Sequence, residues 1–75
     1  MMKYIRTKHG DFYVFHMGIT HTDFARCNYI IKKDIISAGF IYGGQCRDKS
    51  VSLNIAAGPT DTADLMEQMG TEALK

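Results

Sequence analysis

The sequence has few of the features by which large functional classes of protein are recognised. It has two cysteines, nine basic against eight acidic residues, and no apolar run near the roughly 18–20 residues that a membrane span requires. The balanced charge argues against a protein whose main task is to neutralise phosphates. A chain of 75 residues is also too short for a two-layer dinucleotide-binding or barrel enzyme.

The first residues, Met1–Arg6, lack the apolar segment of a secretory signal. We therefore expect a cytoplasmic protein without membrane contact, in which both thiols stay reduced. The composition, 45% hydrophobic and 23% charged, is typical of a folded soluble domain. We expect one domain over residues 1–70 and a frayed tail over residues 71–75.

Two β-favouring runs, 4–8 and 11–17, flank His9-Gly10 and predict a β-hairpin. The second run carries apolar or aromatic side chains on both sides. One side has Phe12 and Val14, and the other has Tyr13, Phe15 and Met17. This pattern is typical of a central strand, or of one whose second face is covered.

A helical pattern follows the hairpin. Apolar residues recur at helical spacing, at Phe24, Cys27, Ile31, Ile35 and Ala38. Thr20 or Thr22 can cap the start of this helix, and Gly39 fits the position just after its end. The pattern predicts one helix up to Ala38, or two shorter pieces broken near Asn28, because asparagine and isoleucine have low helix propensity.

The second half of the chain predicts two strands and a helix. Residues 40–46 form a strand with a bulge at Gly43-Gly44, and residues 50–55 alternate as a strand with one buried side. Asp61 and Asp64 favour the start of a helix, which Gly70 ends.

The order of these elements predicts an α+β fold, a two-layer sandwich in which a four-stranded antiparallel sheet (ββαββα) carries both helices on one face. The predicted core residues are Phe24, Ile31, Ile35, Val51, Leu53, Ile55, Leu65 and Met69.

Part of the sequence resembles short bacterial and phage reading frames of uncharacterised function. The residues concerned lie between positions 11 and 69 and are Phe24-Ala25-Arg26, Ser37-Ala38-Gly39-Phe40, Ser50-Val51-Ser52-Leu53, Pro59, Asp61 and Leu65. The resemblance implies a small intracellular protein of a phage or mobile element. It implies no activity, cofactor or catalytic residue.

The residues that could bind a metal are His16, His21, Cys27 and Cys46. Zinc sites usually contain two close pairs of ligands, and this spacing has none, so we predict no metal and no other cofactor. Cys27 is instead expected in the core. Cys46 could be paired with His9, His16 or His21 as a nucleophile, but no motif orders them. We therefore predict no enzyme.

Two binding functions remain. A nucleic-acid-binding sheet would use strand aromatics and basic residues. These are Phe12, Tyr13, Phe15, Tyr42, Lys3, Arg6, Lys8, Arg47 and Lys49. The near-zero net charge and a strand order unlike that of the RNA-recognition module make nucleic-acid binding the alternative.

The favoured function is a protein-binding accessory module that self-associates as a homodimer or binds another protein. If both helices cover one face of the sheet, the second apolar side of strand 11–17 stays open, and such a patch marks a partner site. The candidate interaction residues are Tyr13, Phe15, Met17, Tyr29 and Ile36.

Overall fold

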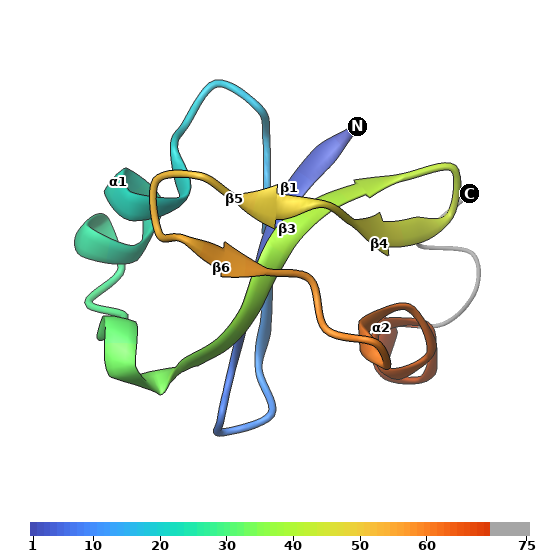
Figure 1. Cartoon of the computed structure of the whole chain (residues 1–75). Coiled ribbons are helices and arrows are strands. Elements are labelled where there is room, and N and C mark those ends of the chain that lie inside the picture. The colour runs from blue at the N-terminus through green and yellow to red at the C-terminus, as the bar shows by residue number, and fades with distance from the viewer. Residues whose placement is uncertain (70–75) are drawn as a thin grey trace.

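The computed structural model describes residues 1–69 and has a four-stranded antiparallel sheet, a two-stranded ribbon and two helices (Figure 1). The sheet, in the order β2-β1-β3-β4, consists of β1 (Met2–Thr7), β2 (Phe12–Phe15), β3 (Ile35–Tyr42) and β4 (Gln45–Arg47). The ribbon pairs β5 (Lys49–Ser50) with β6 (Ile55–Ala56). The helical elements are α1 (His21–Cys27), the short 3₁₀ helix η1 (Lys32–Asp34) and α2 (Asp61–Met69). The predicted α+β fold with a four-stranded antiparallel sheet and two helices is confirmed.

The predicted hairpin forms between β1 and β2. Gly10 turns the chain with a φ of 89°, a value that glycine adopts without steric cost. The Thr7 amide donates to the Asp11 carbonyl over 3.0 Å, and the Gly10 amide donates to the Thr7 carbonyl over 3.0 Å. The ladder then runs from Arg6 opposite Phe12 to Lys3 opposite Phe15.

The sheet has an apolar core on each face. Ile5 of β1 lies on one face, in a cluster with Ala25 of α1 and Leu53 of the ribbon. Its neighbour Tyr4 points to the other face, where it clusters with Leu65 of α2. Figure 1 shows α1 and α2 on opposite sides of the strands. The expectation that both helices share one face is therefore wrong, because the apolar residues on the two sides of β1 and β2 are each covered by a different helix.

The predicted long helix is wrong: the chain breaks near Asn28 as in the alternative, but Ile35–Ala38 belong to strand β3 and not to a second helical piece. Helix α1 ends at Cys27, and the Asn28 side chain donates to the Phe24 carbonyl over 2.8 Å. The chain then passes through η1 and enters β3 at Ile35. Because this segment is not one helix, Ile31 leaves the predicted core and lies exposed.

The strand predicted over residues 50–55 is also wrong. The chain pairs only at Lys49–Ser50 and Ile55–Ala56, and residues 51–54 form the turn between them. Asn54 takes a left-handed conformation in this turn, with a φ of 57°. Leu53 therefore stays buried while Val51 points into water with 81% of its surface exposed.

Gly43 and Gly44, with φ values of 60° and 72°, form the turn of the β3-β4 hairpin instead of a bulge within one strand. Of the other predicted core residues, Ile35 and Leu65 are buried, and Phe24 and Ile55 are half-buried. The predictions for the Met69 side chain, for Gly70 and for the tail 71–75 lie outside the described part of the structure.

Candidate interaction surface

Helix α1 ends in a left-handed residue at Tyr29. At the start of the helix, the Thr20 hydroxyl accepts a hydrogen bond from the Asp23 amide over 3.1 Å. At its end, the Ile30 amide donates to the Ala25 carbonyl over 2.8 Å, which closes the last turn. Tyr29 lies inside this closure with a φ of 58°. Glycine or asparagine usually takes that position, because a larger side chain there costs about 1–3 kcal/mol.

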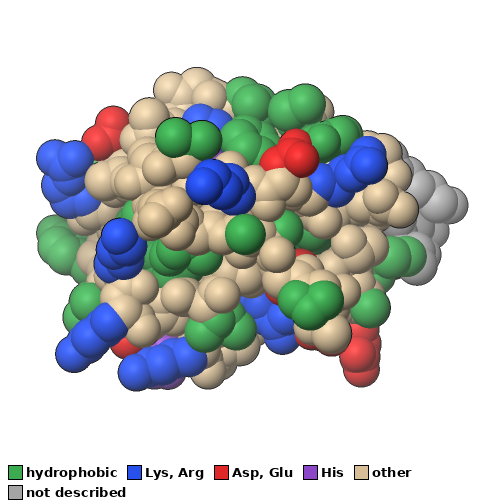
Figure 2. Space-filling view, in the orientation of Figure 1, with side chains coloured by type: hydrophobic (Ala, Val, Ile, Leu, Met, Phe, Trp, Pro, Cys, Tyr) green, Lys and Arg blue, Asp and Glu red, His purple; other side chains and the backbone are tan. Residues whose placement is uncertain are grey.

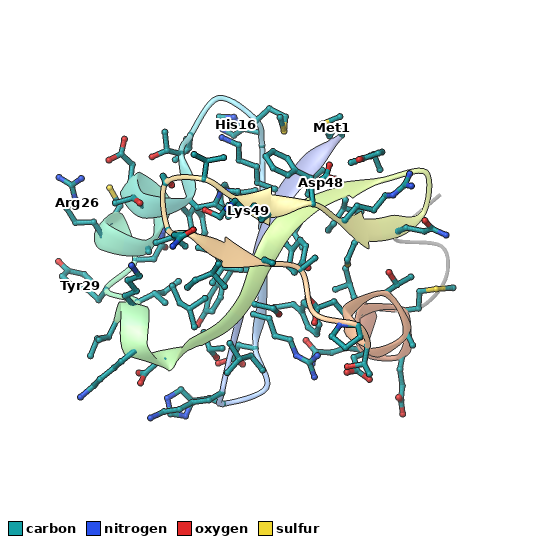
Figure 3. The ribbon with its side chains drawn as sticks, in the orientation of Figure 1. Met1, His16, Arg26, Tyr29, Asp48 and Lys49 are labelled. Atoms are coloured by element: carbon teal, nitrogen blue, oxygen red, sulfur yellow. The ribbon has the colours of Figure 1, made fainter. Side chains whose placement is uncertain are left out.

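The ring of Tyr29 packs against very little of the protein, since 92% of its surface is exposed. Figure 3 shows Tyr29 and Arg26 projecting outward on the same side of the molecule. Ile31, two residues further on, is also exposed, with 55% of its surface open to water. The fold thus presents a strained aromatic residue and an isoleucine to solvent without using either for its core.

Both basic and acidic side chains lie near Tyr29. Arg26 pairs with Asp23 over 2.9 Å, and Lys8 pairs with Asp34 over 3.1 Å. Within residues 1–69, Lys32 has no acidic side chain at ion-pair distance. Figure 2 shows Lys and Arg side chains gathered on the left of the molecule, over α1 and η1. We name Arg26, Tyr29, Ile31 and Lys32 the Tyr29 surface.

Two hollows adjoin the Tyr29 surface, one on each side of Ile30. The larger, of about 420 Å³, has Ala25, Ile30, Leu53, Arg26 and Lys32 among its lining. The smaller, of about 230 Å³, is lined in part by Tyr29 and Ile31 and also by Asp11 and Asp34. An apolar side chain flanked by carboxylates would suit the larger hollow, because apolar residues line it beside two cations.

The structure separates the five predicted interaction residues. Tyr13 and Phe15 lie beneath α1, where the rings of Phe15 and Phe24 stack with centroids 4.0 Å apart. Phe15 is buried and Tyr13 half-buried, so they form no open sheet face. Met17, in the loop after β2, is exposed.

Ile36 is also exposed, because the register between β1 and β3 shifts next to it and leaves it without a cross-strand partner. Of the five predicted residues, only Tyr29 belongs to the Tyr29 surface.

The strand aromatics predicted for nucleic-acid binding do not share one face of the sheet. Phe12, like Tyr13, is half-buried and packs against one of the two cores. Arg6 is held in ion pairs with Asp61 and Asp64 at 3.0 and 2.8 Å. Tyr42 lies under the guanidinium group of Arg47, 5.0 Å from its ring centroid.

The four predicted metal-binding candidates do not meet. His16 is exposed and accepts a hydrogen bond from the Gly18 amide, while His21 is buried and bonds the Gly39 carbonyl over 2.8 Å. Cys27 is exposed on α1, so its predicted place in the core is wrong, and Cys46 is half-buried. Within residues 1–69, no three His, Cys, Asp or Glu side chains are grouped so that they could hold a metal ion.

The most buried ionic group is Asp61, at the start of α2, with 1% of its surface exposed. It accepts hydrogen bonds from the Tyr4 hydroxyl at 2.5 Å, the Gly58 amide at 2.8 Å and Arg6 at 3.0 Å. Burial acts to raise the pKa of Asp61, but these hydrogen bonds outweigh it and hold the pKa below its ordinary value. Burial, reinforced by the bond to Asp61, raises the pKa of Tyr4 far above its usual range. Because every partner is internal, this network fastens α2 to the sheet.

The sequence predicts Tyr29 as an interaction residue, and the structure leaves it exposed, but the sequence does not predict the exposure of its neighbours. The helical stripe predicts Ile31 in the core, and a helix through this segment gives Lys32 no particular role. The usable signal was the low helix propensity of Asn28. A helix that ends there puts the following residues in a loop, where aromatic and basic side chains are open to partners.

Comparison of the chain with family models, with curated proteins and with solved structures gives no match. No helix among residues 1–69 is long and apolar enough to cross a membrane. What the chain does must therefore be inferred from its own surface.

Proposed function

We propose that the chain is a protein-binding module that holds an acidic segment of another protein on the Tyr29 surface. The observation that carries this proposal is the conformation and exposure of Tyr29. A left-handed tyrosine with 92% of its surface in water lowers the stability of the free protein and contributes little packing in return. Strain of this kind, where the fold gains nothing from it, supports a role in binding.

The chemistry of the surface supports an acidic partner. Tyrosine and arginine are the residues that most often dominate protein interfaces, because they combine a large contact area with hydrogen-bonding groups. Lys32 and Arg26 line a hollow together with Ala25, Ile30 and Leu53. A partner segment with one apolar side chain beside carboxylates would fill the hollow and meet both cations.

The two free cysteines support a reducing compartment, such as the cytoplasm, as the place where this binding occurs. Single-stranded nucleic acid is the competing ligand for a surface that joins an aromatic ring to basic side chains. The near-balanced charge of the chain favours the protein partner.

Photo-crosslinking tests the proposal. A benzophenone amino acid at position 29 is introduced in the native host, and a second chain carries it at Val51, which is also exposed but lies outside the Tyr29 surface. We expect a protein adduct from position 29 that survives nuclease treatment and is weak from position 51. Mass spectrometry of the adduct should identify an acidic peptide.

Lys32→Glu, set against Lys49→Glu as a matched charge change outside the surface, should remove most of the adduct from position 29. An adduct that nuclease destroys would show that the ligand is nucleic acid and not a protein. Equal adducts from positions 29 and 51, or indifference to Lys32→Glu, would refute the Tyr29 surface as the binding site.

A further inference from the structure

Strand β2 forms one edge of the sheet and is short, but it lacks the charged residues and proline that often protect an edge. Its four residues, Phe12–Phe15, include no charged residue and no proline. Natural edge strands are normally blunted by such residues, by bulges or by a covering segment, because an open edge pairs readily with another strand. The residues of β2 therefore do little to prevent this edge from pairing with another strand.

The hydrogen-bond pattern of the hairpin shows which backbone groups of β2 face outward. The Thr7 amide bonds the Asp11 carbonyl, so Thr7 and Asp11 form a hydrogen-bonded pair. Such pairs alternate along an antiparallel ladder, which makes Ile5 opposite Tyr13 the next one. The amide and carbonyl groups of Phe12 and Val14 then point away from β1. Within residues 1–69 these groups have no backbone partner on that outer side.

The opposite edge of the sheet is closed. On β4 the outward amide is that of Cys46, and it donates to the Thr62 hydroxyl of α2 over 2.9 Å. Strand β4 also carries the charged Arg47. The same sheet thus has one edge that a helix residue satisfies and one edge that stays open.

We propose that β2 pairs with β2 of a second copy of the chain, antiparallel and about a twofold axis at Tyr13. In this register Phe12 and Val14 of one copy form hydrogen-bonded pairs with Val14 and Phe12 of the other. The two Tyr13 residues form the non-hydrogen-bonded pair between them. The result is a continuous eight-stranded sheet across two copies, the count being twice the four strands of one chain.

A second copy suits this edge better than a foreign strand for two reasons. An antiparallel match of β2 with itself brings no like charges together, because the strand has none. The match is also isologous, so it closes at two copies and leaves no further β2 edge open. Tyr13 would meet Tyr13 of the second copy on one face, and Phe12 would meet Val14 on the other, and these side chains already pack against the two cores.

Concentration-dependent hydrogen exchange, followed by NMR on the full chain, tests this pairing with internal controls. From about 10 µM to about 1 mM, a range chosen for a small interface, sedimentation should show conversion from monomer to dimer. The amides of Phe12 and Val14 should become at least tenfold more protected over this range. The amides of Tyr13 and Phe15, which already bond β1, should be protected throughout.

A chemically synthesised chain with an N-methyl group on Val14 removes one outward donor and leaves the bonds between β1 and β2 in place. We expect its dimer dissociation constant to rise at least tenfold, with an unchanged exchange pattern at Tyr13 and Phe15. In a mixed sample of labelled and unlabelled chains, the Tyr13 Hα atoms should show an intermolecular contact.

A monomer at every concentration would overturn the pairing. A dimer that protects other amides, or that tolerates the N-methyl group, would also overturn it and place the contact elsewhere. None of these results bears on Tyr29, because the crosslinking test reads a different surface and a different partner.

Discussion

The Tyr4 hydroxyl and the Asp61 carboxylate are joined by a 2.5 Å hydrogen bond between residues 57 positions apart. Tyr4 is fully buried on the central strand β1, and Asp61 is the first residue of α2. Arg6, from the same side of β1, adds an ion pair to Asp61 at 3.0 Å. One carboxylate therefore fixes both the position and the orientation of the C-terminal helix on the sheet.

We expect Asp61→Asn to lower the free energy of unfolding by about 2–4 kcal/mol, because it leaves Arg6 without its buried counter-charge. The milder change Tyr4→Phe should cost about 1–1.5 kcal/mol. Urea denaturation measures both. Asp64→Asn is the matched control: this carboxylate is partly exposed, so its loss should cost less than about 1 kcal/mol. Equal effects at positions 61 and 64 would contradict the anchoring role of Asp61.

Tyr29→Gly should stabilise the protein by roughly 1 kcal/mol, because glycine adopts the left-handed conformation without strain and the exposed ring leaves little packing to lose. Thermal unfolding should show a higher midpoint temperature. Asn54→Gly provides the comparison, since asparagine tolerates the same conformation and its replacement should change stability far less. The same Tyr29→Gly chain should lose partner binding. A destabilised variant would show that the ring contributes to the fold.

His21 should make the protein less stable as the pH falls below about 6.5, the ordinary pKa of histidine. Burial lowers the pKa of His21 in the folded state, and the nearby Lys3 acts in the same direction, against the bond to Gly39. The unfolded chain therefore binds the proton first, so this contribution is complete above about pH 6.5 and is lost as the pH falls toward the lowered folded pKa.

His21→Gln should flatten the dependence of the unfolding free energy on pH between about 5 and 7, the range in which histidine titrates. Glutamine can still donate to the Gly39 carbonyl, which His21 meets with Nε2. His9→Gln is the control, because His9 is exposed beside Asp34. An unchanged slope in His21→Gln would show that another group carries the dependence.

Gly39→Ala should destabilise the protein by about 2–3 kcal/mol, since an added methyl group would lie 2.5 Å from the Arg47 carbonyl oxygen. That oxygen belongs to the backbone of β4 and can move only with its strand. Gly43→Ala meets no atom within 4 Å and should cost only about 1 kcal/mol, from its positive φ. Chemical denaturation of the two variants compares the free-energy cost of a steric clash with that of a left-handed backbone.

Local sequence patterns predict correctly the elements whose residues fit only one type of secondary structure. The hairpin before Phe15 follows from Gly10 and two β-favouring runs, and α2 follows from acidic residues before an apolar face. Between Ile31 and Ala38, by contrast, apolar residues fit both a helix and a strand. The sequence predicts Gly39 just after a helix end, whereas in the structure it is the lack of a side chain at Gly39 that lets β4 approach closely.

Which side chains are exposed is harder to predict, because exposure depends on where each helix and strand ends. The alternation at residues 50–55 is real, but a turn at Asn54 reverses the chain and points Val51 outward. Tyr13 and Phe15 lack a covering helix only if both helices lie on one face of the sheet. With a helix on each face, they became core or near-core residues, and Tyr29 remained exposed.

The position of β1 in the middle of the sheet also affects how the chain folds while it is being made. This strand is made before its partners, since its neighbour β3 starts only at Ile35 and the helix that covers Tyr4 only at Asp61. Until that last segment emerges, the apolar side of the hairpin that holds Tyr4, Phe12 and Val14 stays open to water. The nascent chain therefore cannot complete the native contacts of this side before α2 has been made, and chaperones have access to it until then.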